Sequence, residues 1–183
     1  MQTIIPEEIK QRAQQLYLGI SKKNTGNTPI TLLHIADEYT ILVTGSDIAV
    51  ESTWLLNIGS QLTSRSYFKH NSPTPDEVEN AIQVVEDEIM SIRKLITESS
   101  RLFTSDPEIG EIARLTKSAT SDSGDLLLRE DMEHLFNRLA AIITGRPTSQ
   151  DILPTTNTFA ATLLILREVM HHIGFEDIVI LEE

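Results

Sequence analysis

The sequence of 183 residues contains no cysteine and only one tryptophan, and aromatic residues make up 5% of it. Without cysteine there is no disulfide framework and no thiolate chemistry, which is compatible with a reducing cytoplasm, where we expect the protein. Long apolar runs are also missing: segment 159–170 is interrupted by Arg167 and Glu168 and is too short to cross a bilayer. Residues 1–15 carry charge and lack an apolar core, so no signal peptide is predicted.

Basic residues are scarce and scattered. Fifteen Lys and Arg stand against 27 Asp and Glu, which gives a formal net charge of -12 at pH 7. Adjacent basic residues occur only at 22–23 and 93–94, and no basic stripe is readable. Free phosphate polymers, nucleic acids and anionic membranes are therefore repelled unless a local patch reverses the sign, and we expect neither nucleic acid nor membrane as a partner.

The apolar content of 40% is typical of a globular protein. A chain of this length can bury a sizeable core, and we expect one domain over residues 1–183. Proline and acids at residues 6–8 predict a helix to about Leu16, ended by Gly19, and a polar loop over 22–29. Three strand-like runs follow, with a hairpin signal at 45–47 between the second and third. These runs are 30–35, 39–44 and 48–56.

The second half of the sequence alternates helix and strand signals. Apolar residues at three- and four-residue spacing from Val78 to Ile96 predict a helix that starts at Pro75, and its acidic residues are interpreted as a solvated face. Five further elements are predicted: a strand at 101–104, helices at 107–115, 126–144 and 159–173, and a strand at 177–181. Segment 116–125 has the composition of a loop. A meander of three strands followed by alternating helices and short strands indicates an α/β layered domain with helices on both faces.

Four segments carry a resemblance to a known family. They are Tyr17-Leu18-Gly19, ITLLHIADEYTILV at 30–43, TWLLNIGSQLTSR at 53–65 and FAATLLILREVMHHIGFEDIVI at 159–180. In this order they resemble the C-terminal half of the core of the exopolyphosphatase and guanosine pentaphosphate phosphohydrolase (Ppx/GppA) family. The resemblance covers nearly the whole chain and implies a ribonuclease H-like domain, related to actin and sugar kinases, that forms one of two lobes around a cleft.

The family's first phosphate-binding loop falls in segment 34–41. Its aspartate, which helps to hold a divalent metal or orient water, falls at His34, and its glutamate base falls at Ile41. The three glycines and the serine fall at 36–39, which reads Ala-Asp-Glu-Tyr, and only Thr40 is retained. Glycines in such a loop let backbone N–H groups close on phosphate, and isoleucine can neither accept a proton nor polarise water. These positions therefore predict a degenerate loop without a catalytic residue.

The acids of this turn oppose an anion. Asp37 and Glu38 at about 4 Å from a phosphate charge would each oppose it by roughly 4 kcal/mol at an effective dielectric near 20. The family's second loop falls at 104–110, where Thr104, Ser105 and Gly110 are the candidate residues. Its arginine near the third strand falls at Gln61 or Leu62, with Arg65 out of register.

Two other site interpretations were weighed. His34, Asp37 and Glu38 are residue types that bind metals, but a charged hairpin turn after a buried strand is the favoured interpretation, so no metal site is expected. The adjacent His171 and His172 point about 100° apart on a helix and are interpreted as helix-end residues favoured by the dipole.

We therefore expect an exopolyphosphatase-related domain that is non-catalytic and serves as an interaction or regulatory module, without a cofactor. A partner lobe or a second copy of the chain would cover the face built for the other half. The alternative is a hydrolase of polyphosphate or guanosine pentaphosphate, completed by a partner lobe or a dimer, with Mg²⁺ bridging Asp37 and Glu38. The sequence leaves open whether residue 1 is the natural start.

Overall fold

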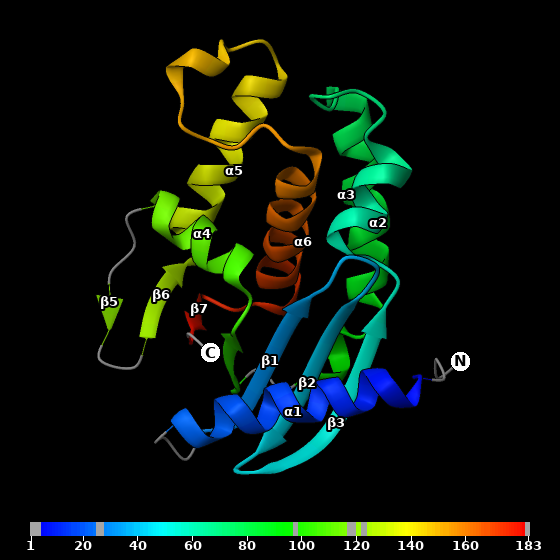
Figure 1. Cartoon of the computed structure of the whole chain (residues 1–183), viewed down its shortest axis with the longest axis vertical. Coiled ribbons are helices and arrows are strands. Elements are labelled where there is room, and N and C mark those ends of the chain that lie inside the picture. Colours follow the sequence, from blue (N-terminus) through cyan, green and yellow to red (C-terminus); the bar gives the residue numbers. More distant parts are fainter. Residues whose placement is uncertain (1–4, 25–27, 97–98, 117–119, 122–123, 182–183) are drawn as a thin grey trace.

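The computed structural model describes residues 5–24, 28–96, 99–116, 120–121 and 124–181, and its centre is one mixed sheet (Figure 1). Seven strands follow one another in the order β3-β2-β1-β4-β7-β6-β5. Their bounds are β1 Ile30–Ile35, β2 Thr40–Ser46, β3 Ala49–Leu56, β4 Arg101–Thr104, β5 Thr120–Ser121, β6 Gly124–Leu128 and β7 Asp177–Ile180.

The sheet has a parallel centre, formed by β1, β4 and β7, and antiparallel strands on both sides of it. β1, β2 and β3 form the predicted antiparallel meander. β1 pairs in parallel with β4, and β4 pairs in parallel with β7. β6 is antiparallel to β7, and β5 is antiparallel to β6. Because β1, β4 and β7 run the same way, the segments that follow them leave the sheet at one end, which is where open α/β sheets carry their ligand sites.

Helices cover both faces of the sheet, as predicted. The helices and 3₁₀ turns are α1 Glu7–Lys23, α2 Ser60–Tyr67, α3 Pro75–Met90, η1 Arg93–Leu95, α4 Pro107–Thr116, α5 Arg129–Ile143, η2 Thr148–Gln150 and α6 Asn157–Ile173. α1 crosses one face, while α2 to α6 lie over the other (Figure 1). Since side chains alternate along a strand, Leu32 packs in the α1 layer and Leu33 in the opposite layer. The expected α/β class, with helices on both faces, is confirmed.

α6 is the centre of the larger layer. Eleven of its 17 residues are buried, and it contacts α2, α3, α4 and α5. The helix ends at Gly174, which adopts the left-handed conformation with φ of 94°, as expected of a C-cap glycine. α3 begins with a capping box, in which Thr74 and Glu77 satisfy each other's backbone N–H groups.

Two helix ends differ from the predictions. α1 continues through Gly19 to Lys23 because Tyr17 and Ile20 extend its buried stripe, and one glycine in a helix costs only about 0.5–1 kcal/mol. α3 ends at Met90 rather than continuing to Ile96, whose side chain is still buried next to η1.

Two elements were missed in the sequence. Segment 60–67, for which no helix was predicted, forms helix α2. Leu126–Leu128, interpreted as the lead into a helix, belongs to strand β6, because pairing with β7 decides its conformation. The loop predicted at 116–125 contains β5 and the start of β6, while 117–119 and 122–123 lie outside the described residues.

The hairpin at 45–47 forms between β2 and β3, but its glycine has another role than expected. Asp47 is the residue with positive φ, at 52°, whereas Gly45 pairs within the sheet. A Cβ atom on Gly45 would lie 2.1 Å from the carbonyl oxygen of Ala49 and 2.6 Å from the hydroxyl of Tyr17. Gly45 is thus required for close packing against α1. Among the described residues, no helix is both long enough and apolar enough to cross a membrane.

Candidate functional site

The two candidate loops lie at the same end of the sheet. The β1–β2 turn, residues 36–39, follows β1, and Ser105 and Asp106 follow the neighbouring parallel strand β4. We call these two segments, together with His34 and Thr40, the turn–loop site. The structure therefore brings the two candidate segments together at one end of the sheet.

A histidine and an aspartate join the two segments. The Nδ1 atom of His34 lies 2.5 Å from Oδ1 of Asp106, and the N–H of Ile35 donates to Oδ2 of Asp106 at 2.7 Å. Asp106 is buried, at 4% exposed, and His34 is half-buried. Both carboxylate oxygens thus have a partner, and the imidazole ring is held in one orientation.

The importance of Asp106 was not recognised in the sequence. An aspartate directly before a proline that opens a helix is a signal for a helix start, and α4 begins at Pro107. That signal predicts an ordered aspartate, but it does not indicate His34 as its partner, 72 residues away in the chain.

Carbonyl groups of the β1–β2 turn accept hydrogen bonds from the first amides of helix α2. The N–H of Ser60 donates to the carbonyl of Ala36 at 3.0 Å, and the N–H groups of Gln61 and Leu62 donate to the carbonyl of Asp37 at 3.0 and 2.9 Å. Free amides at a helix start are the groups that bind phosphate in other proteins. Here they are already satisfied by the turn itself, so the turn and α2 close on each other and leave no amide nest.

Gly59 makes this closure sterically feasible. A Cβ atom at this position would lie 2.5 Å from the carbonyl oxygen of Asp37 and 2.5 Å from the nitrogen of Tyr39. Real Cβ atoms do not approach backbone atoms so closely, so only glycine fits between α2 and the turn. The sequence analysis assigned no role to this glycine, because its neighbour is distant in the chain.

The two acids of the turn have different surroundings. The guanidinium of Arg65 contacts both carboxylate oxygens of Glu38, at 2.5 and 2.6 Å. The hydrogen bond from Arg65 lowers the pKa of Glu38, and Glu38 in turn raises the pKa of Arg65. Asp37 accepts a hydrogen bond from the hydroxyl of Ser60 at 3.3 Å. The expectation that both acids oppose an anion is thus corrected for Glu38, whose charge is balanced by Arg65.

The hydroxyl-bearing candidates support the backbone. Thr40 is buried and donates to the carbonyl of Ile58 at 2.6 Å. Thr104 is also buried, and its hydroxyl accepts from the N–H of Asp106 at 3.0 Å. Ser105 lines a hollow of about 280 Å³ together with α1. Gly110 was predicted to belong to the second loop, but it lies inside α4, where an added Cβ would meet only ordinary contacts.

Metal ligands do not converge in the part of the chain that the structure describes. No group of three or more His, Asp and Glu side chains there is arranged to hold an ion. Within the turn–loop site, His34 is directed to Asp106 and Glu38 to Arg65, which separates the three residues considered as metal ligands.

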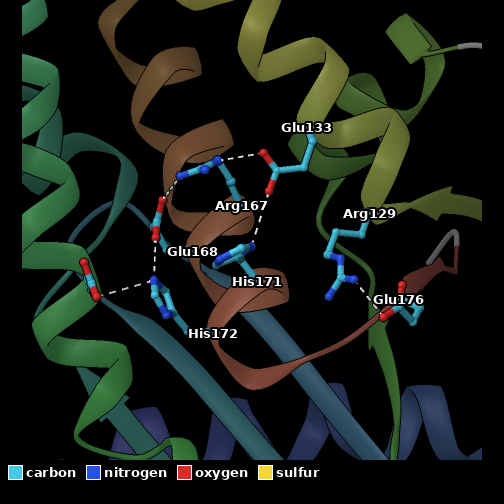
Figure 2. Close-up of polar contacts among 8 residues, drawn as sticks. Arg129, Glu133, Arg167, Glu168, His171, His172 and Glu176 are labelled. Atoms are coloured by element: carbon cyan, nitrogen blue, oxygen red, sulfur yellow. Dashed lines mark hydrogen bonds and ion pairs between the residues drawn. The ribbon is translucent and has the colours of Figure 1, made fainter.

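A second polar cluster lies on the last turns of α6 (Figure 2). We call it the α6 network. Arg167 contacts Glu168 and lies 2.9 Å from Glu133 of α5. His172 lies 2.9 Å from Glu168 and 3.8 Å from Glu86 of α3. Because α6 leads into the start of β7, the network lies toward the opposite end of the parallel strands from the turn–loop site.

The α6 network connects three helices. Glu168 is buried at 1% exposed and contacts both a guanidinium and an imidazole, which provides the partners that a buried carboxylate needs. His171 instead points to Glu133, with 3.6 Å between Nδ1 and the carboxylate. The two histidines lie in the last turn of α6, as expected, and they have different partners. Arg167 also lies over the ring of Phe136.

No protein-family model matches the sequence, and no curated protein matches it. Solved structures do match the fold. A Ppx/GppA phosphatase from Aquifex aeolicus superposes with a TM-score of 0.78 at 16% identity, over 94% of this chain and 59% of that one. An exopolyphosphatase from Cytophaga hutchinsonii gives 0.69 at 12% identity, over 94% and 59%. A protein described as exopolyphosphatase-like gives 0.74 at 15%, over 98% and 62%.

These comparisons confirm the resemblance at the level of fold. Nearly the whole chain has the fold of a part of the Ppx/GppA structures, and it spans about three fifths of their length.

Proposed function

We propose that this chain is an exopolyphosphatase-like domain that does not hydrolyse phosphoanhydrides and serves as an interaction or regulatory module. One observation carries the proposal. The amides of Ser60, Gln61 and Leu62, which a phosphate would need, donate to the carbonyls of the β1–β2 turn. An anion entering there would have to displace these hydrogen bonds and approach the carboxylate of Asp37. The loop that would bind phosphate therefore stabilises the packing of α2 instead.

The proposed partner is another lobe or a second copy of the chain. The matched structures are longer than this chain, which covers 59–62% of them. A lobe whose relatives pack against further structure is suited to binding another domain. No cofactor is required for this role.

A second candidate function is favoured by the contact between His34 and Asp106. A carboxylate that holds an imidazole in one orientation is an arrangement that general bases use to activate water. In this alternative, a partner lobe would complete a phosphoanhydride hydrolase with Mg²⁺ at Asp37, and His34 would accept the proton from water.

A phosphate-release assay separates the two functions. The purified chain is incubated with polyphosphate, guanosine pentaphosphate and nucleotides in the presence of Mg²⁺ or Mn²⁺, and released phosphate is measured colorimetrically. We expect no release above that of a heat-inactivated sample. Release that is lost in both His34→Ala and Asp37→Ala, but kept in the matched surface variant Asp87→Ala, would establish the hydrolase instead.

A further inference from the structure

β3 forms one outer edge of the sheet. It pairs with β2 on one side, and no described strand pairs with its other side. In an antiparallel pair, alternate residues direct their N–H and C=O groups away from the partner strand. The regular part of this edge, Ser52–Leu56, is about 16 Å long at 3.3 Å per residue and ends at a register shift between β2 and β3. It therefore offers a row of backbone groups that another extended chain can pair with.

This edge lies at the floor of a groove of about 970 Å³. One wall is the start of α1 with Ile5 and Lys10, and the other is the end of α3 and η1 with Glu88, Ile92 and Leu95. The groove runs beside residues 51–57, whereas Ala49 and Val50 of β3 are exposed and do not line it.

The two faces of β3 present different chemistry to the groove. Trp54 packs against the α2–α6 layer, on the side of Ile92 and Leu95, and Leu95 is 61% exposed. Leu55 packs against the α1 layer, and Glu51, four residues earlier at the register shift of β3, lies toward the same layer. Burial and then the nearby carboxylates of Glu51 and Asp47 raise the pKa of Tyr17 on α1, which agrees with this placement of Glu51.

Carboxylates exceed cations along this groove. Among the described residues that line it, Glu51 and Glu88 are acidic and Lys10 is basic, and Lys10 lies 4.0 Å from Glu7 of its own helix. Glu88 already accepts from the N–H of Asn57 at 3.1 Å, and its other oxygen can accept a further hydrogen bond. The groove therefore complements a positively charged chain.

We propose that the β3 edge binds an extended basic peptide segment of a partner protein, which adds a strand to the sheet. On the face toward α3, an apolar side chain of the peptide packs over Trp54 and Leu95, and a basic side chain two residues away pairs with Glu88. Backbone pairing supplies affinity, and these two side-chain contacts supply specificity. The proposal specifies a partner for the interaction role above, but it depends on β3 and the groove beside it and does not involve the turn–loop site.

The probe is a fluorescent, acetylated eight-residue peptide in which threonine alternates with leucine, arginine, valine and arginine. Two matched peptides serve as controls: one carries glutamate in place of both arginines, and one is N-methylated at alternate residues, so that it cannot pair as a strand. Fluorescence anisotropy measures binding, and hydrogen–deuterium exchange locates it. We expect saturable binding of the first peptide only, with slower exchange in 49–56.

Protein variants test the residues. Glu88→Lys and Leu95→Asp each weaken binding by about tenfold or more, whereas Asp87→Lys, an exposed neighbour on α3 outside the groove, changes it less than about twofold. Absence of binding, equal binding of any control peptide, or equal weakening by Asp87→Lys overturns the proposal. A dimer seen by light scattering with β3 amides already protected also overturns it. The phosphate-release result is independent of all these outcomes.

Discussion

Asp106 is the residue on which the two halves of the turn–loop site depend. Its buried carboxylate accepts from the backbone of Ile35 and contacts the ring of His34. Removing a buried carboxylate leaves both donors without a partner, and such losses cost about 3 kcal/mol. We expect Asp106→Ala to lower the free energy of unfolding by about this amount, measured by urea denaturation. Asp106→Asn, which keeps an acceptor, should lose less.

The control for this prediction is Asp87→Ala, which removes an exposed carboxylate from α3 and should change the free energy of unfolding by less than about 0.5 kcal/mol. Equal stability of the Asp106→Ala and Asp87→Ala variants would contradict the role given to Asp106.

Glu77 provides the clearest pH dependence at the scale of single residues. Hydrogen bonds from the backbone of Thr74, from His70 and from the backbone of Lys69 lower its pKa from 4.5 to about 2. Because the folded pKa is below the unfolded one, Glu77 stabilises the fold fully above about pH 4.5 and loses this contribution as the pH falls toward 2. Glu77→Gln keeps the capping box. Its unfolding free energy should therefore fall less than that of the wild type between pH 5 and 2, and parallel curves would refute the assignment.

At the scale of elements, the contact between α2 and the β1–β2 turn depends on Gly59. An alanine there would place its Cβ 2.5 Å from backbone atoms of Asp37 and Tyr39, and such overpacking costs about 1–3 kcal/mol. We expect Gly59→Ala to be destabilised by at least this much. The matched change Gly19→Ala, on an exposed turn of α1 with no atom near the new methyl group, should stabilise by about 0.5–1 kcal/mol. Thermal unfolding of the two variants gives opposite shifts, and shifts of the same sign would disprove this packing.

The elements that could be predicted are those whose conformation is determined by local sequence. β1, α3 and α6 have strong periodicity and clear start or stop residues, and they form close to where they were expected. α2 is short and polar, and its place in the fold depends on its contact with α6. Its sequence alone therefore resembles a turn. Residues 125–128 of β6 pair with residues 177–180 of β7, which no local pattern of leucines can indicate.

The site could be predicted only in part for the same reason. The sequence located His34 and Thr104 at neighbouring strand ends, because the order of elements indicated the fold. It did not reveal that Arg65 neutralises Glu38, or that the carbonyls of 36–37 occupy the amides of α2. Both features arise from residues more than twenty positions apart, and only the folded chain brings them together.

At the scale of the whole molecule, the chain is an acidic domain with a mixed sheet and two helical layers. Its fold matches about three fifths of larger Ppx/GppA structures, but identity of 12–16% leaves the chemistry to be decided by its own residues. Its residues 36–37 and 60–62 are hydrogen-bonded to one another, and no described strand pairs with the outer side of β3. These observations support the proposal that the edge of the sheet, and not the loops, is the functional surface.

A titration of the ¹⁵N-labelled chain with pyrophosphate, with and without Mg²⁺, measures directly whether the first amides of helix α2 bind an oxyanion. The backbone N–H signals of Ser60, Gln61 and Leu62 report on the ligand, because these groups would have to exchange a carbonyl partner for a phosphate oxygen. We predict that their chemical shifts stay unchanged up to millimolar pyrophosphate, as do those of residues 36–39. Saturable shifts confined to these amides at micromolar concentrations would show a working phosphate site and would contradict the non-catalytic assignment.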